Sequence, residues 1–245
     1  MNLTDSTWTD VDAVDTDLAV VPVGSTEQHG PHGPRGPATL TAQAVSDAGV
    51  ERCEREVVVT PAVPVGVAEE HRQFTGTLWV SENSFRAYLR DVVRSLAHHG
   101  FDRVVFVNGH GGNVSALREV AGTITRHDDA YAVPFTWFDA VGERAPDMGH
   151  GGPVETSLLL ATEPDTVATD RLDEARDGGS DGWGEWCHHV NLAFDSAEFT
   201  ENGTVGDPTA ASEERGRELL EGAATALAEL LETVAERETA RPPHR

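Results

Sequence analysis

Short apolar runs alternate along this chain with longer segments whose apolar residues recur at helical spacing. The apolar runs predict buried strands at residues 17–23, 56–60, 103–108 and 131–135. The segments between and after them predict helices at residues 39–54, 82–99, 113–126, 152–162 and 208–238. This alternation favours an α/β fold, a mostly parallel central sheet with helices on both faces.

Several helix ends carry their own local signals. Gly100 is expected to stop the helix at 82–99, and Asn113 is expected to cap the helix that follows the third strand. Asp207 is expected to cap the last helix, with Pro208 at its first position.

Residues 172–206 show no clear periodicity. They hold two Trp and two adjacent His among Gly and acidic residues, and they suit either a long loop over a site or an oligomer contact. We expect residues 1–245 to form a single domain, because neither repeats nor a low-complexity linker divide the chain.

The charge narrows the class of protein. The chain has 42 Asp and Glu against 18 basic residues, all of them Arg, and a net charge of −24. Such a surface repels nucleic acid and anionic membranes. It is either an ordinary solvated surface or an adaptation to a high-salt cytoplasm, and the size of the charge favours the second, because salt screens self-repulsion.

Other features of composition point to the cytoplasm. No apolar run reaches the roughly 18 residues that a membrane span needs. The acidic N-terminal stretch lacks the layout of a signal peptide. The two cysteines, Cys53 and Cys187, make neither a disulfide framework nor a cysteine metal site.

Three Gly-rich segments carry His and Glu. STEQHGPH follows the first strand, and in extended backbone its Glu27 and His29 leave on the same side, where they can share a divalent ion. NGHGGN, residues 108–113, places His110 directly after the third strand. MGHGGPVETS, residues 148–157, adds His150 and Glu155 at the start of a helix.

Each segment alone has an ordinary explanation as a turn or a helix start. Together they favour a metal site, because ligands in open α/β sheets bind beyond the carboxyl ends of the strands. Other histidines lack this setting: we expect three to be solvated and leave the last two open, namely His98, His99, His127, His188 and His189.

Four motifs in order along the chain resemble the signatures of one known family. They are VPVGSTEQHGPHGP at 21–34, GVAEEHRQFTGTL at 66–78, VNGHGGN at 107–113 and GHGGPVETS at 149–157. They resemble the creatininase family of metal-dependent amidohydrolases, over about residues 19–160. The resemblance implies a three-layer α/β/α fold, one or two zinc, manganese or iron ions, and a homo-oligomer, often a hexamer.

The resemblance also implies roles for individual residues. Glu27, His29 and His110 match metal ligands, and Glu155 matches a glutamate that is either a ligand or the base acting on water. His150 matches the histidine that handles protons near the scissile bond. Glu70 and His71 lie in the motif that borders the substrate pocket.

Two positions depart from the family pattern. Ala38 stands where relatives carry an Asp that bridges two ions, and Gly112 stands where creatininase has a Glu. Nearby Arg35 would repel a second cation or bind an anionic group of the substrate. Three interpretations stay open: one surviving ion, substitution by a neighbour such as His32, or a non-catalytic relative.

The resulting hypothesis is a hydrolase with about one divalent ion per chain, acting on a small-molecule substrate through a non-peptide C–N bond. The substrates open to it are a creatinine-like lactam, a formamide of a pyrimidine nucleotide, and a short peptide. The alternative is a catalytically silent subunit or binding protein of the same fold. Metal content separates the two classes.

Overall fold

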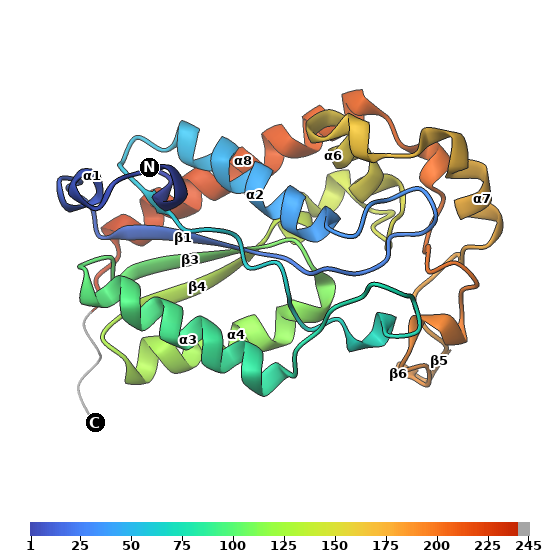
Figure 1. The fold of residues 1–245 in the computed structure, drawn as a ribbon, viewed down its shortest axis with the longest axis horizontal. Coiled ribbons are helices and arrows are strands. Elements are labelled where there is room, and N and C mark those ends of the chain that lie inside the picture. The colour runs from blue at the N-terminus through green and yellow to red at the C-terminus, as the bar shows by residue number, and fades with distance from the viewer. Residues whose placement is uncertain (240–245) are drawn as a thin grey trace.

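A four-stranded parallel sheet lies at the centre of the computed structural model, which describes residues 1–239 (Figure 1). Its strands are β1 (Leu18–Val23), β2 (Val58–Val59), β3 (Arg103–Asn108) and β4 (Tyr131–Thr136), in the spatial order β2–β1–β3–β4. Val23 pairs with Asn108, and Asn108 with Thr136. The carboxyl ends of three strands therefore meet at one edge.

Helices cover both faces of this sheet (Figure 1). One face carries α2 (Pro37–Arg52), α6 (Pro153–Thr162) and α8 (Glu213–Glu236), and the other carries α3 (Glu82–His98) and α4 (Val114–His127). Burial on both faces explains why the strands are continuously apolar. The expected α/β fold is confirmed.

Each face of the sheet has its own hydrophobic core, because successive side chains of a strand point to opposite sides. Val20 and Val105 pack with Leu227 of α8, whereas Val21 and Phe106 pack on the α3–α4 side.

Shorter elements complete the chain. The remaining α-helices are α1 (Trp8–Asp12), α5 (Trp137–Ala140) and α7 (Leu172–Asp177), and β5 (Trp186–Cys187) pairs antiparallel with β6 (Val190–Asn191). Single 3₁₀ turns occur at Leu3–Asp5, Glu69–His71, Gly111–Asn113, Gly142–Arg144, Pro164–Thr166, Thr169–Arg171, Ser196–Glu198 and Pro208–Ala210. No helix within residues 1–239 is long and apolar enough to cross a membrane.

Most predicted elements are present, with shifted ends. The helix predicted at residues 39–54 is α2, which starts at Pro37. The strand predicted at residues 56–60 is β2, which has only two residues. Gly100, at φ +94°, follows the end of α3 as predicted.

Two predicted caps are wrong. Asp207 caps only the 3₁₀ turn at Pro208–Ala210, and α8 begins later, where Ser212 Oγ accepts from the backbone N–H of Arg215. Asn113 makes no capping hydrogen bond, because its side chain joins two loops instead: Nδ2 donates to the Gly24 carbonyl, and Oδ1 accepts from the N–H of Val67.

Candidate metal centre

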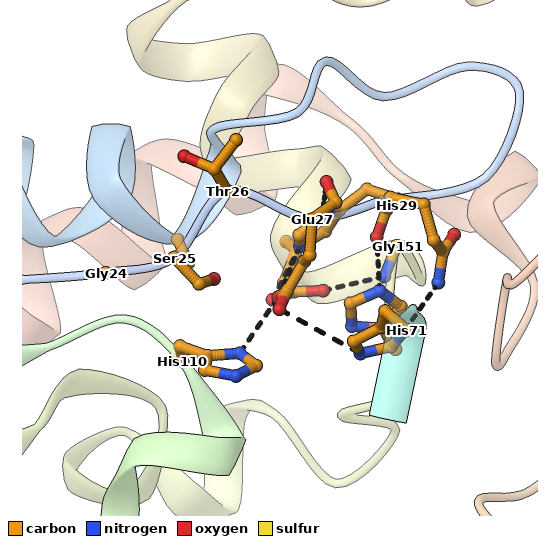
Figure 2. Close-up of polar contacts among 12 residues, drawn as sticks. Gly24, Ser25, Thr26, Glu27, His29, His71, His110 and Gly151 are labelled. Carbon is orange, nitrogen blue, oxygen red and sulfur yellow. Dashed lines mark hydrogen bonds and ion pairs between the residues drawn. The ribbon is translucent and has the colours of Figure 1, made fainter. Parts of the chain in front are cut away.

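The loop after β1 turns its polar side chains inward. Its two ends are joined by the Glu27 N–H, which donates to the Arg35 carbonyl at 2.8 Å, and the N–H of Gly33 donates to the His29 carbonyl at 3.2 Å. Glu27 and His29 are 0% and 1% exposed. Figure 2 shows both side chains directed to the same side of the loop, toward His110 and His71.

The loop after β3 is built around His110. Its N–H donates to Asn108 Oδ1 at 3.1 Å, and Asn108 Nδ2 donates back to the His110 carbonyl at 2.8 Å. Nδ1 of the ring lies 2.8 Å from Glu27 Oε1, while Nε2 donates to the Val67 carbonyl at 2.7 Å. Because a carbonyl only accepts, the Nε2 position carries a hydrogen, so Nδ1 is the ring atom that can gain or lose a proton toward the carboxylate.

Gly112 makes that arrangement possible. A Cβ at this position would collide with the Val67 carbonyl and approach His110 Nε2 to 2.5 Å. The Glu that creatininase carries here does not fit this backbone. The glycine is therefore a packing requirement of the His110 loop.

A second cluster forms where the loop before α6 meets His29. Nε2 of His29 lies 3.6 Å from Glu155 Oε1, and the other oxygen of Glu155 accepts from the N–H of Gly151 at 2.7 Å. Nε2 of His150 donates to the Gln28 carbonyl at 2.5 Å, and the His150 ring lies 4.3 Å from that of His29. These contacts leave His150 Nδ1 and Glu155 Oε1 free to bind an ion.

His71 is more central than its motif suggested. It is 1% exposed, its Nε2 lies 3.9 Å from Glu27 Oε2, and its ring stacks on His150 at 4.3 Å. Gln28 Nε2 and Ser196 Oγ each lie 3.0 Å from its Nδ1. Sequence reasoning missed Gln28 and Ser196; the placement of Gln28 between the two ligand candidates was the available signal, and Ser196 had none.

The cluster separates charged from neutral groups. Burial opposes the charge on Glu27, but the nearby histidines, His110 above all, outweigh it and hold its pKa well below the usual range. Burial also lowers the pKa of His110, yet the Glu27 carboxylate raises it to about 9. Burial is the largest cause that lowers the pKa of His71 to about 2 and of His150 to about 4.

The same balance acts on the second cluster. Burial opposes ionisation of Glu155, but His29 outweighs it, and the pKa of Glu155 is lowered. Burial lowers the pKa of His29, whereas Glu155 and then Glu27 raise it, with a net rise. At neutral pH the site thus combines anionic Glu27 and Glu155 with neutral His71 and His150.

The residues fit a divalent ion. Five of the eight buried side-chain polar atoms that lack a hydrogen-bond partner among the described residues lie in the loop after β1: Ser25 Oγ, both oxygens of Glu27, His29 Nε2 and His32 Nδ1. Donor atoms come within 4.8 Å of one another in two groups, Glu27–His71–His150 and His29–His150–Glu155. Zinc holds N and O donors at about 2.0–2.2 Å, so two donors of one ion lie roughly 3–3.5 Å apart. The Glu27–His110 separation of 2.8 Å is slightly shorter than that.

His110 and Glu70 are in neither group, although His110 contacts Glu27, and three further positions singled out in the sequence also lie outside. His32 is buried, and its Nε2 bonds Thr156 Oγ1 at 3.0 Å. Ala38 is buried in the first turn of α2, and its carbonyl packs directly on Gly109, beside His110. Arg35 is exposed with its guanidinium near Gly76, and it does not line the cavity described next.

A cavity of about 810 Å³ opens over the cluster. Glu70, His71, His110, His150 and Glu155 line it, so the expectation that Glu70 and His71 face a pocket agrees with this geometry. Glu27 and His29 lie behind these residues. The far wall comes from residues 181–194, which include the β5–β6 hairpin.

Comparison with known proteins identifies the family. The family described as creatinine amidohydrolase matches residues 4–231, and the chain belongs to this creatininase family of amidohydrolases. Its relatives include the mycofactocin precursor peptide peptidase of Mycolicibacterium smegmatis, 38% identical over 82% of this chain and 79% of the relative. They also include the creatinine amidohydrolase of Pseudomonas putida, 28% identical over 83% of this chain and 84% of the relative.

Solved structures agree with that assignment. A tryptophan-to-phenylalanine mutant of creatininase superposes with a TM-score of 0.82 at 26% identity, covering 96% of this chain and 99% of its own. Two further creatininase structures, both at 25% identity with a TM-score of 0.81, are a zinc–zinc form and a manganese form.

Proposed function

We propose that this chain is a metal-dependent amidohydrolase that cleaves an amide bond of a short peptide and holds one divalent ion. The observation that carries the proposal is the buried contact of Glu27 Oε1 with His110 Nδ1 at 2.8 Å. In the metal-free protein a proton on His110 lies between these two atoms, and a divalent ion would take the place of that proton between two ligand-type groups.

Glu27, His110 and His29 are the ligands we propose, with Glu155 or His150 completing the set. A zinc, manganese or iron ion bound there supplies Lewis acidity, which polarises an amide carbonyl and makes water a better nucleophile near neutral pH. The loss of a bridging carboxylate at Ala38 weakens a second site most, because that carboxylate serves both ions in relatives.

The protein's own groups manage the protons. Glu155 Oε2 is anchored by the N–H of Gly151, which holds Oε1 toward the cluster as a proton acceptor. His150 is neutral and anchored through Nε2, so its Nδ1 is available to a proton near the leaving nitrogen. Burial raises the pKa of Glu70, which suits a carboxyl group that donates a proton to substrate.

The size of the cavity supports a peptide substrate. Pockets for drug-sized ligands measure about 300–1,000 Å³, and 810 Å³ exceeds what a single small lactam ring fills. The peptidases among the relatives support the same choice over the non-peptide C–N bond expected from the sequence. The proposal therefore narrows the three substrates to the peptide.

One observation favours a second candidate, a catalytically silent relative. Ala38 cannot bind metal, and Gly112 removes another carboxylate that creatininase has. In a silent relative, a proton on His110 Nδ1 would form a hydrogen bond to Glu27, and no metal ion would be bound.

Metal loading followed by peptide digestion separates the two candidates. Protein loaded with Mn²⁺, Zn²⁺ or Fe²⁺ is incubated with a pool of capped hexapeptides, and the products are read by mass spectrometry. We expect cleavage that His110→Ala abolishes and His127→Ala, on the exposed end of α4, leaves intact. Metal retained by His110→Ala at parental affinity would refute the ligand assignment, and metal without cleavage would refute the peptidase.

A further inference from the structure

We infer that the cavity selects substrates whose part beyond the scissile amide is cationic or uncharged, and that it rejects phosphate and carboxylate groups. The inference rests on the proposed function and defines its substrate class further. It follows from the charges on the cavity wall.

The wall carries only acidic ionisable groups besides histidine. Five of its residues are acidic, and none of the described residues that line it is Arg; the chain has no Lys at all. The acidic residues are Glu70, Asp147, Glu155, Asp181 and Asp207. A phosphate or carboxylate site in a protein normally offers Arg, Lys or a helix N-terminus.

These five carboxylates differ in how far their charge is already compensated. Asp147 pairs with Arg215, which lies outside the lining, and Asp207 accepts hydrogen bonds from Thr209. Asp181 is exposed and forms no ion pair with any described residue. Glu70 lies 3.6 Å from His110 Nε2, at the inner end of the cavity. Asp181 therefore presents a charge with no ion-pair partner among the described residues, whereas the other four carboxylates have partners or neighbouring donors.

Aromatic side chains form another part of the cavity wall and also favour cationic or uncharged substrates. Trp183 lines the cavity, its ring edge-on to His71 at 5.6 Å and to His150 at 6.0 Å, and Phe199 packs against it at 5.2 Å. Phe194 also lines the cavity and is 85% exposed. Aromatic faces accept apolar groups and ammonium or guanidinium cations. The wall offers contact area to such groups, and the N-terminus of α6 beside it already carries the Glu155 carboxylate, held by the N–H of Gly151.

The buried cluster below the wall shows that the acidic lining belongs to a ligand site. Both oxygens of Glu27 are buried there without a hydrogen-bond partner among the described residues. A divalent ion on Glu27 and Glu155 is balanced by those two carboxylates, so it leaves the outer wall negative. Among the substrates considered for this family fold, a phosphorylated nucleotide is disfavoured.

Three capped peptides that differ in one charge provide the test. The probes are acetyl-Gly-Xaa-Phe-Gly-amide with Lys, Gln or Glu as Xaa. Isothermal titration to the metal-free protein measures binding without turnover or carboxylate–metal contact, and mass spectrometry of the metal-loaded protein measures cleavage. We expect the Lys peptide to bind at least about fivefold more tightly than the Glu peptide, with the Gln peptide between them.

Matched variants separate the cavity from the charge of the whole molecule. Asp181→Asn should reduce the Lys-to-Glu binding ratio about two- to threefold. Asp5→Asn removes the same charge from an exposed position in the 3₁₀ turn before α1, and should leave the ratio unchanged. Figure 1 shows α1 at the opposite end of the molecule from β5 and β6.

Each outcome has a defined meaning. The inference is overturned if the Glu peptide binds as well as the Lys peptide, if none of the three binds, or if both Asn variants change the ratio equally. Preferred binding of the Lys peptide without cleavage by the metal-loaded protein would instead remove the hydrolase assignment and leave the charge selection standing.

Discussion

The loop after β1 lies behind the side chains that line the cavity, the segment from α7 to residue 206 contributes residues to its wall, and the two segments differ in burial. In the first, Glu27, Gln28 and His29 are buried, and Glu27 and His29 are held by backbone hydrogen bonds at the sheet edge. The second is exposed and turns through His188 and His189, both at positive φ. We propose that the chemistry lies on the buried loop and that the exposed segment contributes substrate contacts.

The largest expected effect is that of salt on the melting temperature. Salt should act through the charged surface rather than through the buried metal centre. A net charge of −24 without Lys is self-repelling at low ionic strength. We expect the melting temperature to rise by roughly 10 °C or more between low and molar KCl, equivalent to several kcal/mol. A flat melting profile would discard the salt-adapted interpretation.

The second largest expected effect is that of pH on metal affinity, and it should act through the buried histidines and carboxylates of the metal centre. The folded-state pKa of His110 is raised from 6.5 to about 9, so its proton stabilises the metal-free fold fully below pH 6.5, and this contribution is lost as pH rises through 9. A metal ion must displace that proton. Metal affinity should therefore rise about tenfold per pH unit up to pH 9, or more steeply if His29 also releases one.

Calorimetry in two buffers of different ionisation enthalpy measures this release directly. We expect at least one proton per bound ion below pH 8, and His127→Ala should behave as the parent. Metal affinity that is independent of pH from 6.5 to 8.5 would contradict a ligand role for His110.

A methyl group at Gly112 should perturb the centre more mildly. Gly112→Ala forces a collision with the Val67 carbonyl that anchors His110. Loss of this anchor should weaken metal binding about tenfold, because groups that orient metal ligands contribute on that order. Gly111→Ala is the matched control, since a Cβ there meets nothing within 4 Å. Equal metal affinity in both variants would show that the Val67 contact does not position the ligand.

The hairpin should affect the metal centre least. Trp186, Val190 and Leu192 are more than half exposed, which is unusual for apolar side chains on a free surface. We propose that they contribute to a homo-oligomer, a hexamer by resemblance. Light scattering in high salt should show several chains per particle, and Trp186→Ser should shift it toward smaller species with unchanged metal affinity. A single-chain mass for the parent would contradict the proposal.

The sequence predicted the buried region far better than the exposed one. Strand–helix alternation was enough to predict that Glu27, His29 and His110 lie at one sheet edge, because parallel strands end together. His150 and Glu155 were singled out by their own Gly-rich motif, which does not directly follow a strand. The stacking of His71 on His150 was not predictable, since residues 69–71 follow no strand.

The wrong predictions share a physical cause. Asn113 and Asp207 are both residue types that cap helices well. The Asn113 side chain instead hydrogen-bonds two neighbouring loops, and the Asp207 side chain caps a 3₁₀ turn rather than α8. Local propensity was overruled where two loops had to be joined. For residues 172–206 the sequence predicted only two alternatives, a loop over a site or an oligomer contact, because the stretch has no repeating apolar pattern.

The number of metal ions per chain is the most direct test of the proposed one-ion metal centre. Parent, Ala38→Asp and His110→Ala are loaded with Mn²⁺ or Zn²⁺, desalted and analysed by mass spectrometry for metal per chain. We expect about one ion per chain in the parent, a rise toward two ions per chain in Ala38→Asp, and loss of the bound ion in His110→Ala. Two ions in the parent would show that another residue replaces the missing carboxylate, and none in either the parent or Ala38→Asp would show a silent relative rather than an enzyme.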